Sequence, residues 1–140
     1  MGYSRSDKRG CDIYFYRRHI GGLLVWHWAL TFWWDDGYKE TYEADKRGDY
    51  LRMDWYEGKP DPSHDWDLWN SYRCNNCSPA EVTRTAKGLD CVDRTYSWMY
   101  SNCHDFAKAL ASKFGVSLPP GIAKVVRTIG TLGLDNFLNH

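Results

Sequence analysis

The sequence predicts one α+β domain in which a small antiparallel sheet packs against helices, and three observations support this fold class. The chain has 140 residues, the size of one ordinary domain. Segments rich in β-branched and aromatic residues occupy its first half. Two segments with helix-capping residues occupy its second half. Residues 1–10 are polar and are expected to be flexible, so the predicted domain spans residues 11–140.

Four strands are predicted from the apolar pattern. Residues 12–17 and 23–33 are rich in strand-forming types. Asp35-Asp36-Gly37 is typical of a hairpin turn, so residues 38–45 return as the next strand. Residues 50–56 complete the set, and a proline-containing loop anchored by two tryptophans is expected after them.

Two helices are predicted from their ends. Ser78-Pro79-Ala80-Glu81 combines a capping box with proline at the first helical position, and this helix is expected to end at about Lys87. Residues 102–114 form the second predicted helix because Phe, Leu and Phe recur there every four residues and Gly115 follows. The amphipathic tail, residues 121–138, is a candidate for a last helix.

Composition excludes some classes of function. Eighteen basic and eighteen acidic residues give a formal net charge of zero, which argues against a nucleic-acid-binding protein. The longest apolar stretch, residues 21–34, is too short to span a bilayer. The start of the chain lacks the apolar core of a secretory signal, which slightly favours the cytoplasm and leaves the localisation otherwise unknown. Gly2 followed by Ser6 also matches the loose pattern for N-myristoylation.

The five cysteines leave several chemical states open: Cys11, Cys74, Cys77, Cys91 and Cys103. Because their number is odd, at least one is unpaired within the chain. With Cys103 free, the other four allow two disulfides in three pairings. Cys74 and Cys77 also have zinc-knuckle spacing, with Cys91 or His64 as a further ligand.

Cys103 is the candidate nucleophile. It lies in the first turn of the second predicted helix, just after the capping candidates Ser101 and Asn102. The helix dipole and the unpaired N–H groups of a first turn stabilise an anion, and therefore favour a thiolate over a thiol. A buried structural cysteine is the alternative interpretation of the same position.

His27 is the candidate base. Strand alternation places large apolar residues on one face of the strand and His27 with Ala29 and Thr31 on the other. We expect the helix that carries the nucleophile to lie on this second face, because the residues of that face are small. A histidine on a strand beside a cysteine at a helix start is the arrangement that a thiol nucleophile needs.

Glu43 is the candidate third residue, which holds the imidazole by its other nitrogen. A hairpin turn at Asp35-Asp36-Gly37 places His27 opposite Ala44 or Asp45, depending on the register. With Asp45 opposite, Glu43 is the diagonal neighbour on the same face. Asp45, Glu40 and Tyr42 are the rival candidates.

Two motifs carry a resemblance to a known group of enzymes. His27-Trp28-Ala29-Leu30 on an early strand, followed by Asn102-Cys103-His104-Asp105-Phe106 at a helix start, resembles a circularly permuted papain-like thiol enzyme of the NlpC-like superfamily. The lecithin:retinol acyltransferase-like group and the PPPDE peptidases share this order. The resemblance covers residues 20–45 and 98–115, about a third of the chain. It implies His27 as base, Cys103 as nucleophile and a polar third residue near Glu43, where the acyltransferase-like group often has a second histidine.

These observations predict a cysteine-dependent hydrolase or acyl-transfer enzyme that needs no metal or organic cofactor. The first choice of substrate is a peptide or isopeptide amide, and an acyl lipid is the alternative. A binding module without catalytic activity is a further alternative, because the many tryptophans suit recognition. The sequence leaves the oligomeric state open.

Overall fold

The computed structural model describes residues 4–19, 26–97 and 102–117. The chain forms the elements β1 (Arg9–His19), β2 (Trp26–Trp34), β3 (Lys39–Arg47), β4 (Tyr50–Glu57), β5 (Asp67–Cys77), α1 (Pro79–Lys87) and α2 (Cys103–Lys113). The predicted α+β class with an antiparallel sheet and helices is therefore confirmed at this level. The predicted tail helix over 121–138 and the myristoylation pattern at Gly2 lie outside the described residues.

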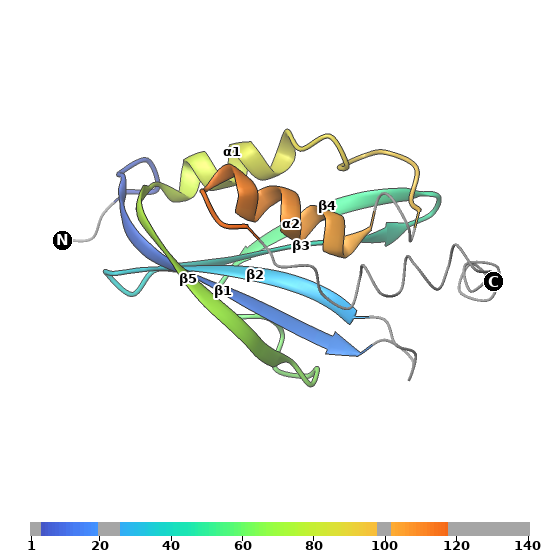
Figure 1. Ribbon diagram of the computed structural model, residues 1–140, viewed down its shortest axis with the longest axis horizontal. Helices are drawn as coiled ribbons and strands as arrows, with labels where there is room; N and C mark the ends of the chain where they lie inside the picture. Colours follow the sequence, from blue (N-terminus) through green and yellow to red (C-terminus); the bar gives the residue numbers. More distant parts are fainter. Residues whose placement is uncertain (1–3, 20–25, 98–101, 118–140) are drawn as a thin grey trace.

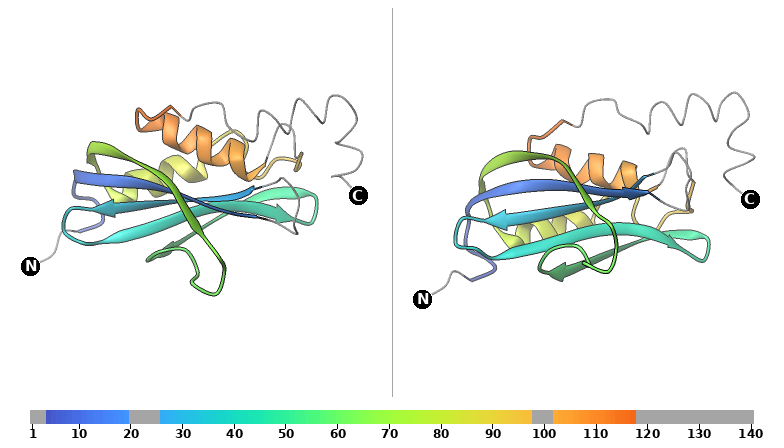
Figure 2. Two further views of the ribbon diagram at one scale, coloured as in Figure 1. Left: turned by 60° about the horizontal axis from the view of Figure 1, so that its bottom comes forward. Right: turned by 90° about the horizontal axis from the view of Figure 1, so that it is seen from below.

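The strands form one antiparallel sheet in the order β4-β3-β2-β1-β5. Figures 1 and 2 show both helices on one face of this sheet and the loop between β4 and β5 on the other. The sheet is thus covered on both faces at its centre, which explains why both faces of β2 are buried. Among the described helices, neither is long and apolar enough to cross a membrane.

The predicted turn at Gly37 and a second turn at Gly48 form because glycine takes a backbone conformation that other residues avoid. Gly37 has φ +92° between β2 and β3, and its N–H donates to the carbonyl of Trp34 at 2.9 Å. Gly48 has φ +60° between β3 and β4. The first turn sets the β2–β3 register, in which Ala29 lies opposite Glu43.

Both predicted helices begin and end close to the expected residues. Ser78 caps α1 in a complete capping box with Glu81. Asn102 caps α2, where its side chain accepts hydrogen bonds from the backbone N–H groups of His104 and Asp105. Local capping chemistry was therefore sufficient to locate both helices.

The fifth strand was not predicted. We expected a loop after residue 56, but only residues 58–66 form one, and Asp67–Cys77 pairs with β1 along the edge of the sheet. This strand is rich in polar residues and mostly exposed, so it lacks the apolar alternation that marks a strand in a sequence. The N-terminal segment also makes ordered contacts: Arg9 and Gly10 lie in β1, and Arg5 binds Glu40.

The expected position of α2 was wrong. The helix packs on the aromatic face of β2, where its His104 ring contacts Trp28 and the Phe114 ring at its end contacts Phe32. Large aromatic side chains fill the space between this helix and the sheet. The face of β2 that carries His27, Ala29 and Thr31 is the opposite one, on the side of the β4–β5 loop. His27 and Cys103 meet because α2 begins near the first residue of β2.

Candidate active site

Cys103 occupies the first position of α2, directly after the Asn102 cap. The side chain is half-buried, and its sulfur lies 3.4 Å from the backbone carbonyl oxygen of Trp26, which accepts a hydrogen bond from the thiol. Trp26 immediately precedes His27 in β2. The nucleophile candidate is therefore held at the start of the strand that carries the base candidate.

His27 is buried, with 3% of its side chain exposed, and contacts Glu43, the expected third residue. Its Nε2 atom lies 2.9 Å from Oε1 of Glu43. Burial alone would lower the pKa of His27, but hydrogen bonds with Cys103 and Glu43 outweigh burial and raise this pKa to about 10. The ring is therefore an imidazolium at neutral pH, and its Nε2–H donates to the Glu43 carboxylate.

Glu43 is held by two donors. Oε1 accepts from His27, and Oε2 accepts from the Tyr56 hydroxyl of β4 at 2.5 Å. Burial alone would raise the pKa of this carboxyl group, but the two hydrogen bonds outweigh burial and lower it. Glu43 therefore stays ionised and fixes the imidazole on the side away from Cys103.

The observed register explains why Glu43 rather than its rivals meets His27. Extending the β2–β3 ladder from the Ala29–Glu43 pair places Asp45 opposite His27 and Glu43 on the diagonal. Asp45 is exposed. Glu40 and Tyr42 lie on the other face of β3, where Tyr42 donates to Glu40 at 2.6 Å.

A pocket of about 470 Å³ borders the Glu43 carboxylate, which is the one candidate catalytic residue that lines it. It is lined by Arg18, Glu43, Asp45, Asp54, Trp55, Tyr56, Asp61, His64 and Trp66. The Trp66 ring lies 5.6 Å from the His27 ring, so the loop tryptophan joins the pocket to the imidazole. The polar lining suits a polar substrate segment better than a hydrocarbon chain.

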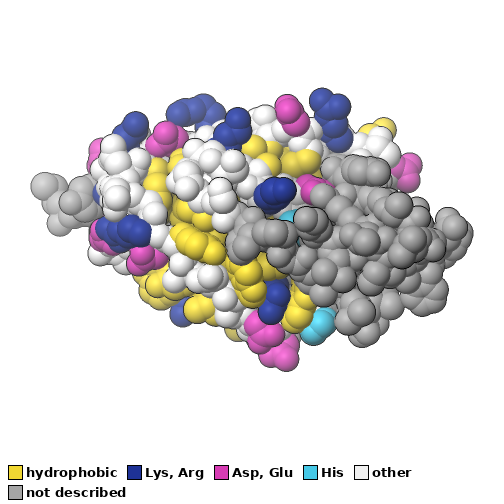
Figure 3. Space-filling view, in the orientation of Figure 1, with side chains coloured by type: hydrophobic (Ala, Val, Ile, Leu, Met, Phe, Trp, Pro, Cys, Tyr) yellow, Lys and Arg dark blue, Asp and Glu magenta, His cyan; other side chains and the backbone are white. Residues whose placement is uncertain are grey.

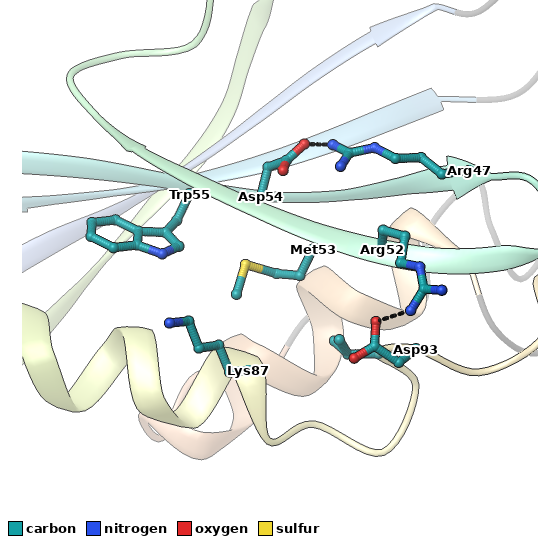
Figure 4. A pocket seen from close by; sticks show the side chains of 8 residues that line it. Arg47, Arg52, Met53, Asp54, Trp55, Lys87 and Asp93 are labelled. Atoms are coloured by element: carbon teal, nitrogen blue, oxygen red, sulfur yellow. Dashed lines mark hydrogen bonds and ion pairs between the residues drawn. The ribbon is translucent and has the colours of Figure 1, made fainter.

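A second pocket of about 490 Å³ lies between β4 and α1 and does not include the candidate catalytic residues. Figure 4 shows that two ion pairs occupy its sides, Arg52 with Asp93 and Arg47 with Asp54. The charges that line it are therefore largely paired with each other. On the face that Figure 3 shows, acidic and basic side chains are interspersed.

The tryptophans divide between two environments. Trp34 is buried in the core, and Trp69 of β5 contacts Phe15 and Trp28 edge-on. Trp66 alone of the loop pair lines the pocket beside Glu43. His64, considered as a zinc ligand, is exposed and lines the same pocket.

All five cysteines are thiols in the structure, but they are not equivalent. Cys91 or His64 was considered as a further zinc ligand for Cys74 and Cys77, but the structure places Cys11 beside this pair instead. Sequence spacing did not reveal this because Cys11 is brought in by the pairing of β1 with β5.

Two further residues of the site were missed. Tyr56 holds Glu43, and the register across the turn at Gly48 would have revealed it, because Glu43 lies opposite Asp54 and Tyr56 is on the diagonal. Tyr96 is the other: burial, followed by the nearby Cys103 and Asp45, raises the pKa of its phenol to about 12. Tyr96 lies between α1 and α2, in a segment whose sequence has no pattern that predicts a position near Cys103.

Comparison with known proteins gives no match: no family model matches the chain, and no curated protein or solved structure is significantly similar to it. The function of this site therefore has to be argued from its own geometry.

Proposed function

We propose that this chain is a cysteine-dependent hydrolase or acyl-transfer enzyme of papain-like type, with Cys103 as nucleophile, His27 as acid and base, and Glu43 as the positioning residue. The observation that carries the proposal is a buried imidazole that lies 2.9 Å from an ionised carboxylate and whose pKa is raised by the nearby Cys103 at a helix start. In the reactive form that we propose, the thiol proton of Cys103 has passed to His27, so that a thiolate faces an imidazolium.

The reaction follows from these positions. The Cys103 sulfur attacks the carbonyl carbon of an amide, and a bond from sulfur to carbon forms. The backbone N–H of Cys103, in the first turn of α2, is the donor we assign to the developing oxyanion. His27 gives its proton to the leaving nitrogen as the carbon–nitrogen bond breaks. His27 then takes a proton from water or another acceptor, which attacks the thioester and frees the sulfur.

A peptide or isopeptide amide is the substrate class that the pocket favours. Four carboxylates, one arginine and two tryptophans line it, so charged and aromatic groups predominate. A fatty acyl chain needs a mainly apolar lining, whereas polar peptide groups find donors and acceptors here. An acyl lipid remains the alternative substrate of the same chemistry.

The test is to trap the acyl-enzyme. The chain is incubated with peptide coumarin amides, an acyl-lysine isopeptide and a short-chain phospholipid in separate arms, quenched in acid and mapped by mass spectrometry. We expect an acyl group on Cys103 and release of amine in an amide arm. Cys91→Ser, the matched control at a half-buried cysteine, retains both signals, and Cys103→Ala loses both.

Each other result contradicts part of the proposal. An adduct in the phospholipid arm alone overturns the amide assignment and keeps the nucleophile. Binding without an adduct in any arm overturns the enzyme and identifies a binding module. An equal yield of product from Cys103→Ala removes Cys103 from the reaction.

A further inference from the structure

A second group of sulfur atoms lies on the helix-facing side of the sheet, at its β1–β5 edge. Cys11 of β1 and Cys74 of β5 are direct cross-strand partners. The Cys77 sulfur lies 3.4 Å from the Cys11 sulfur and 3.4 Å from the Cys74 sulfur. All three sulfur atoms lie within 4.8 Å of one another, so they converge on one point.

An irregularity of the sheet produces this convergence. Residues three apart in a regular strand point to opposite faces, so Cys74 and Cys77 would normally diverge. Here Cys11 pairs with Cys74, and Arg9 pairs with Cys77, which gives β5 one residue more than β1 over the same length. This bulge turns Cys77 to the same side as the other two cysteines.

The spacing fits a shared metal ion better than a disulfide. Two thiolates on one tetrahedral zinc ion, each with a Zn–S bond of about 2.3 Å, lie about 3.8 Å apart. A disulfide needs a separation of about 2.05 Å and uses only two sulfurs. A bridge through Cys77 would therefore leave a third buried thiol against it, whereas a metal ion uses all three.

Burial and charge indicate which ion. Cys11 is 0% exposed and Cys77 1%, while Cys74 on the edge strand is 9% exposed. Three thiolates bound to Zn²⁺ carry a net charge of −1, whereas three thiolates bound to Cu⁺ carry −2. Because burial penalises the larger charge, the site favours Zn²⁺.

We infer that Cys11, Cys74 and Cys77 form a structural zinc site that fastens the edge strand β5 to β1. Each thiol that binds Zn²⁺ releases its proton, and no oxidant takes part. Among the described residues, no fourth histidine, cysteine or carboxylate joins the group, so water from the Cys74 side completes the coordination. The inference is independent of the proposed reaction at Cys103.

The experiment uses the full chain, reduced and freed of reductant, with zinc chloride as the probe. Native mass spectrometry is expected to find one zinc ion per chain in the wild type, in Cys91→Ser and in Cys103→Ser. Cys74→Ser and Cys77→Ser are expected to lose it. Because Cys103→Ser has no nucleophile, zinc uptake by this variant separates the inference from the enzyme proposal.

A second measurement does not depend on the folding of variants. In the wild type, zinc is expected to protect Cys11, Cys74 and Cys77 from iodoacetamide during limited labelling and to raise the melting temperature, while Cys103 stays reactive. Absence of zinc uptake by the reduced wild type overturns the inference. Zinc retained by both Cys74→Ser and Cys77→Ser, or protection that does not include these three residues, also overturns it.

Discussion

Two glutamates on β3, three residues apart, are both ionised and partly or fully buried, yet they differ in what surrounds them. Glu40 faces the helices and is fully buried. It accepts hydrogen bonds from Arg5, Tyr38 and Tyr42. Burial would raise the pKa of Glu40, but these donors outweigh it and lower the pKa. None of these donors is a histidine or a cysteine, and Glu40 lines neither of the two pockets described above.

Glu43 faces the other side of the sheet and has a different set of neighbours. Its donors are His27 and Tyr56, and it borders a pocket. The imidazole that it binds lies near Cys103, which raises the pKa of His27. The comparison teaches that burial and a lowered pKa do not distinguish a structural carboxylate from a functional one. What distinguishes Glu43 is a titratable partner with a nucleophile and a pocket beside it.

The largest expected effect comes from replacing His27, the hydrogen-bond partner of Glu43. His27→Gln retains side-chain bulk and removes the proton donor, so amide turnover is expected to fall by about 1,000-fold, within the usual range for a general acid and base. The measurement is kcat/KM on whichever amide forms the acyl-enzyme. Unchanged turnover, with a folded variant by circular dichroism, would remove His27 from the mechanism.

Glu43→Gln is expected to lower kcat/KM by about 100-fold, because the imidazole loses its orienting anion. Loss of an anion disfavours the charged ring, so the pKa of His27 should fall from about 10, and an NMR titration of the ring follows it. Glu40→Gln is the matched control on the same strand and should leave this titration in place. A His27 pKa that does not move would mean that Glu43 has only a packing role.

Glu40→Gln is expected to lower the stability of the fold and to leave the reactivity of Cys103 unchanged. It leaves three donors around a neutral group in the core, so the free energy of unfolding is expected to fall by about 2 kcal/mol. Denaturant titration measures this loss, and the alkylation rate of Cys103 in the folded variant should match that of the wild type. Slower alkylation of Cys103 would show that the two carboxylates are coupled and would break the comparison.

Tyr56→Phe is expected to have the smallest effect. It removes one hydrogen bond to Glu43, which costs about 1 kcal/mol, or roughly a fivefold reduction in kcat/KM if all of it acts on the positioning of Glu43. Tyr38→Phe removes the equivalent hydrogen bond to Glu40 and should change stability without changing kcat/KM. Equal losses of kcat/KM in Tyr56→Phe and Tyr38→Phe would argue against separate roles for the two faces of β3.

Local signals predicted the parts of the fold that depend on local chemistry. Ser78 and Asn102 locate the two helices because a cap needs only the residues of the first turn. Gly37 locates the hairpin, and the resulting register brings Glu43 to His27. This part of the site was predictable because a short hairpin fixes which residues lie diagonally opposite.

The remaining parts depend on contacts between distant segments. β5 is a polar edge strand that forms by pairing with β1, and its bulge brings Cys77 to Cys11. The side of β2 covered by α2 could not be chosen from alternation because both faces of this strand are buried. Small residues suggested one face, whereas the aromatic residues that fill the space beneath the helix occupy the other.

The most direct test of the Cys103–His27 pair is a comparison of two cysteines within one chain. Burial raises the pKa of Cys91, so this thiol reacts slowly at pH 6 and serves as an internal reference. With iodoacetamide at pH 6 and mass mapping, Cys103 is predicted to react at least about tenfold faster than Cys91 and to lose that advantage in His27→Gln. Equal rates in the wild type, or an advantage that survives in His27→Gln, would contradict the account.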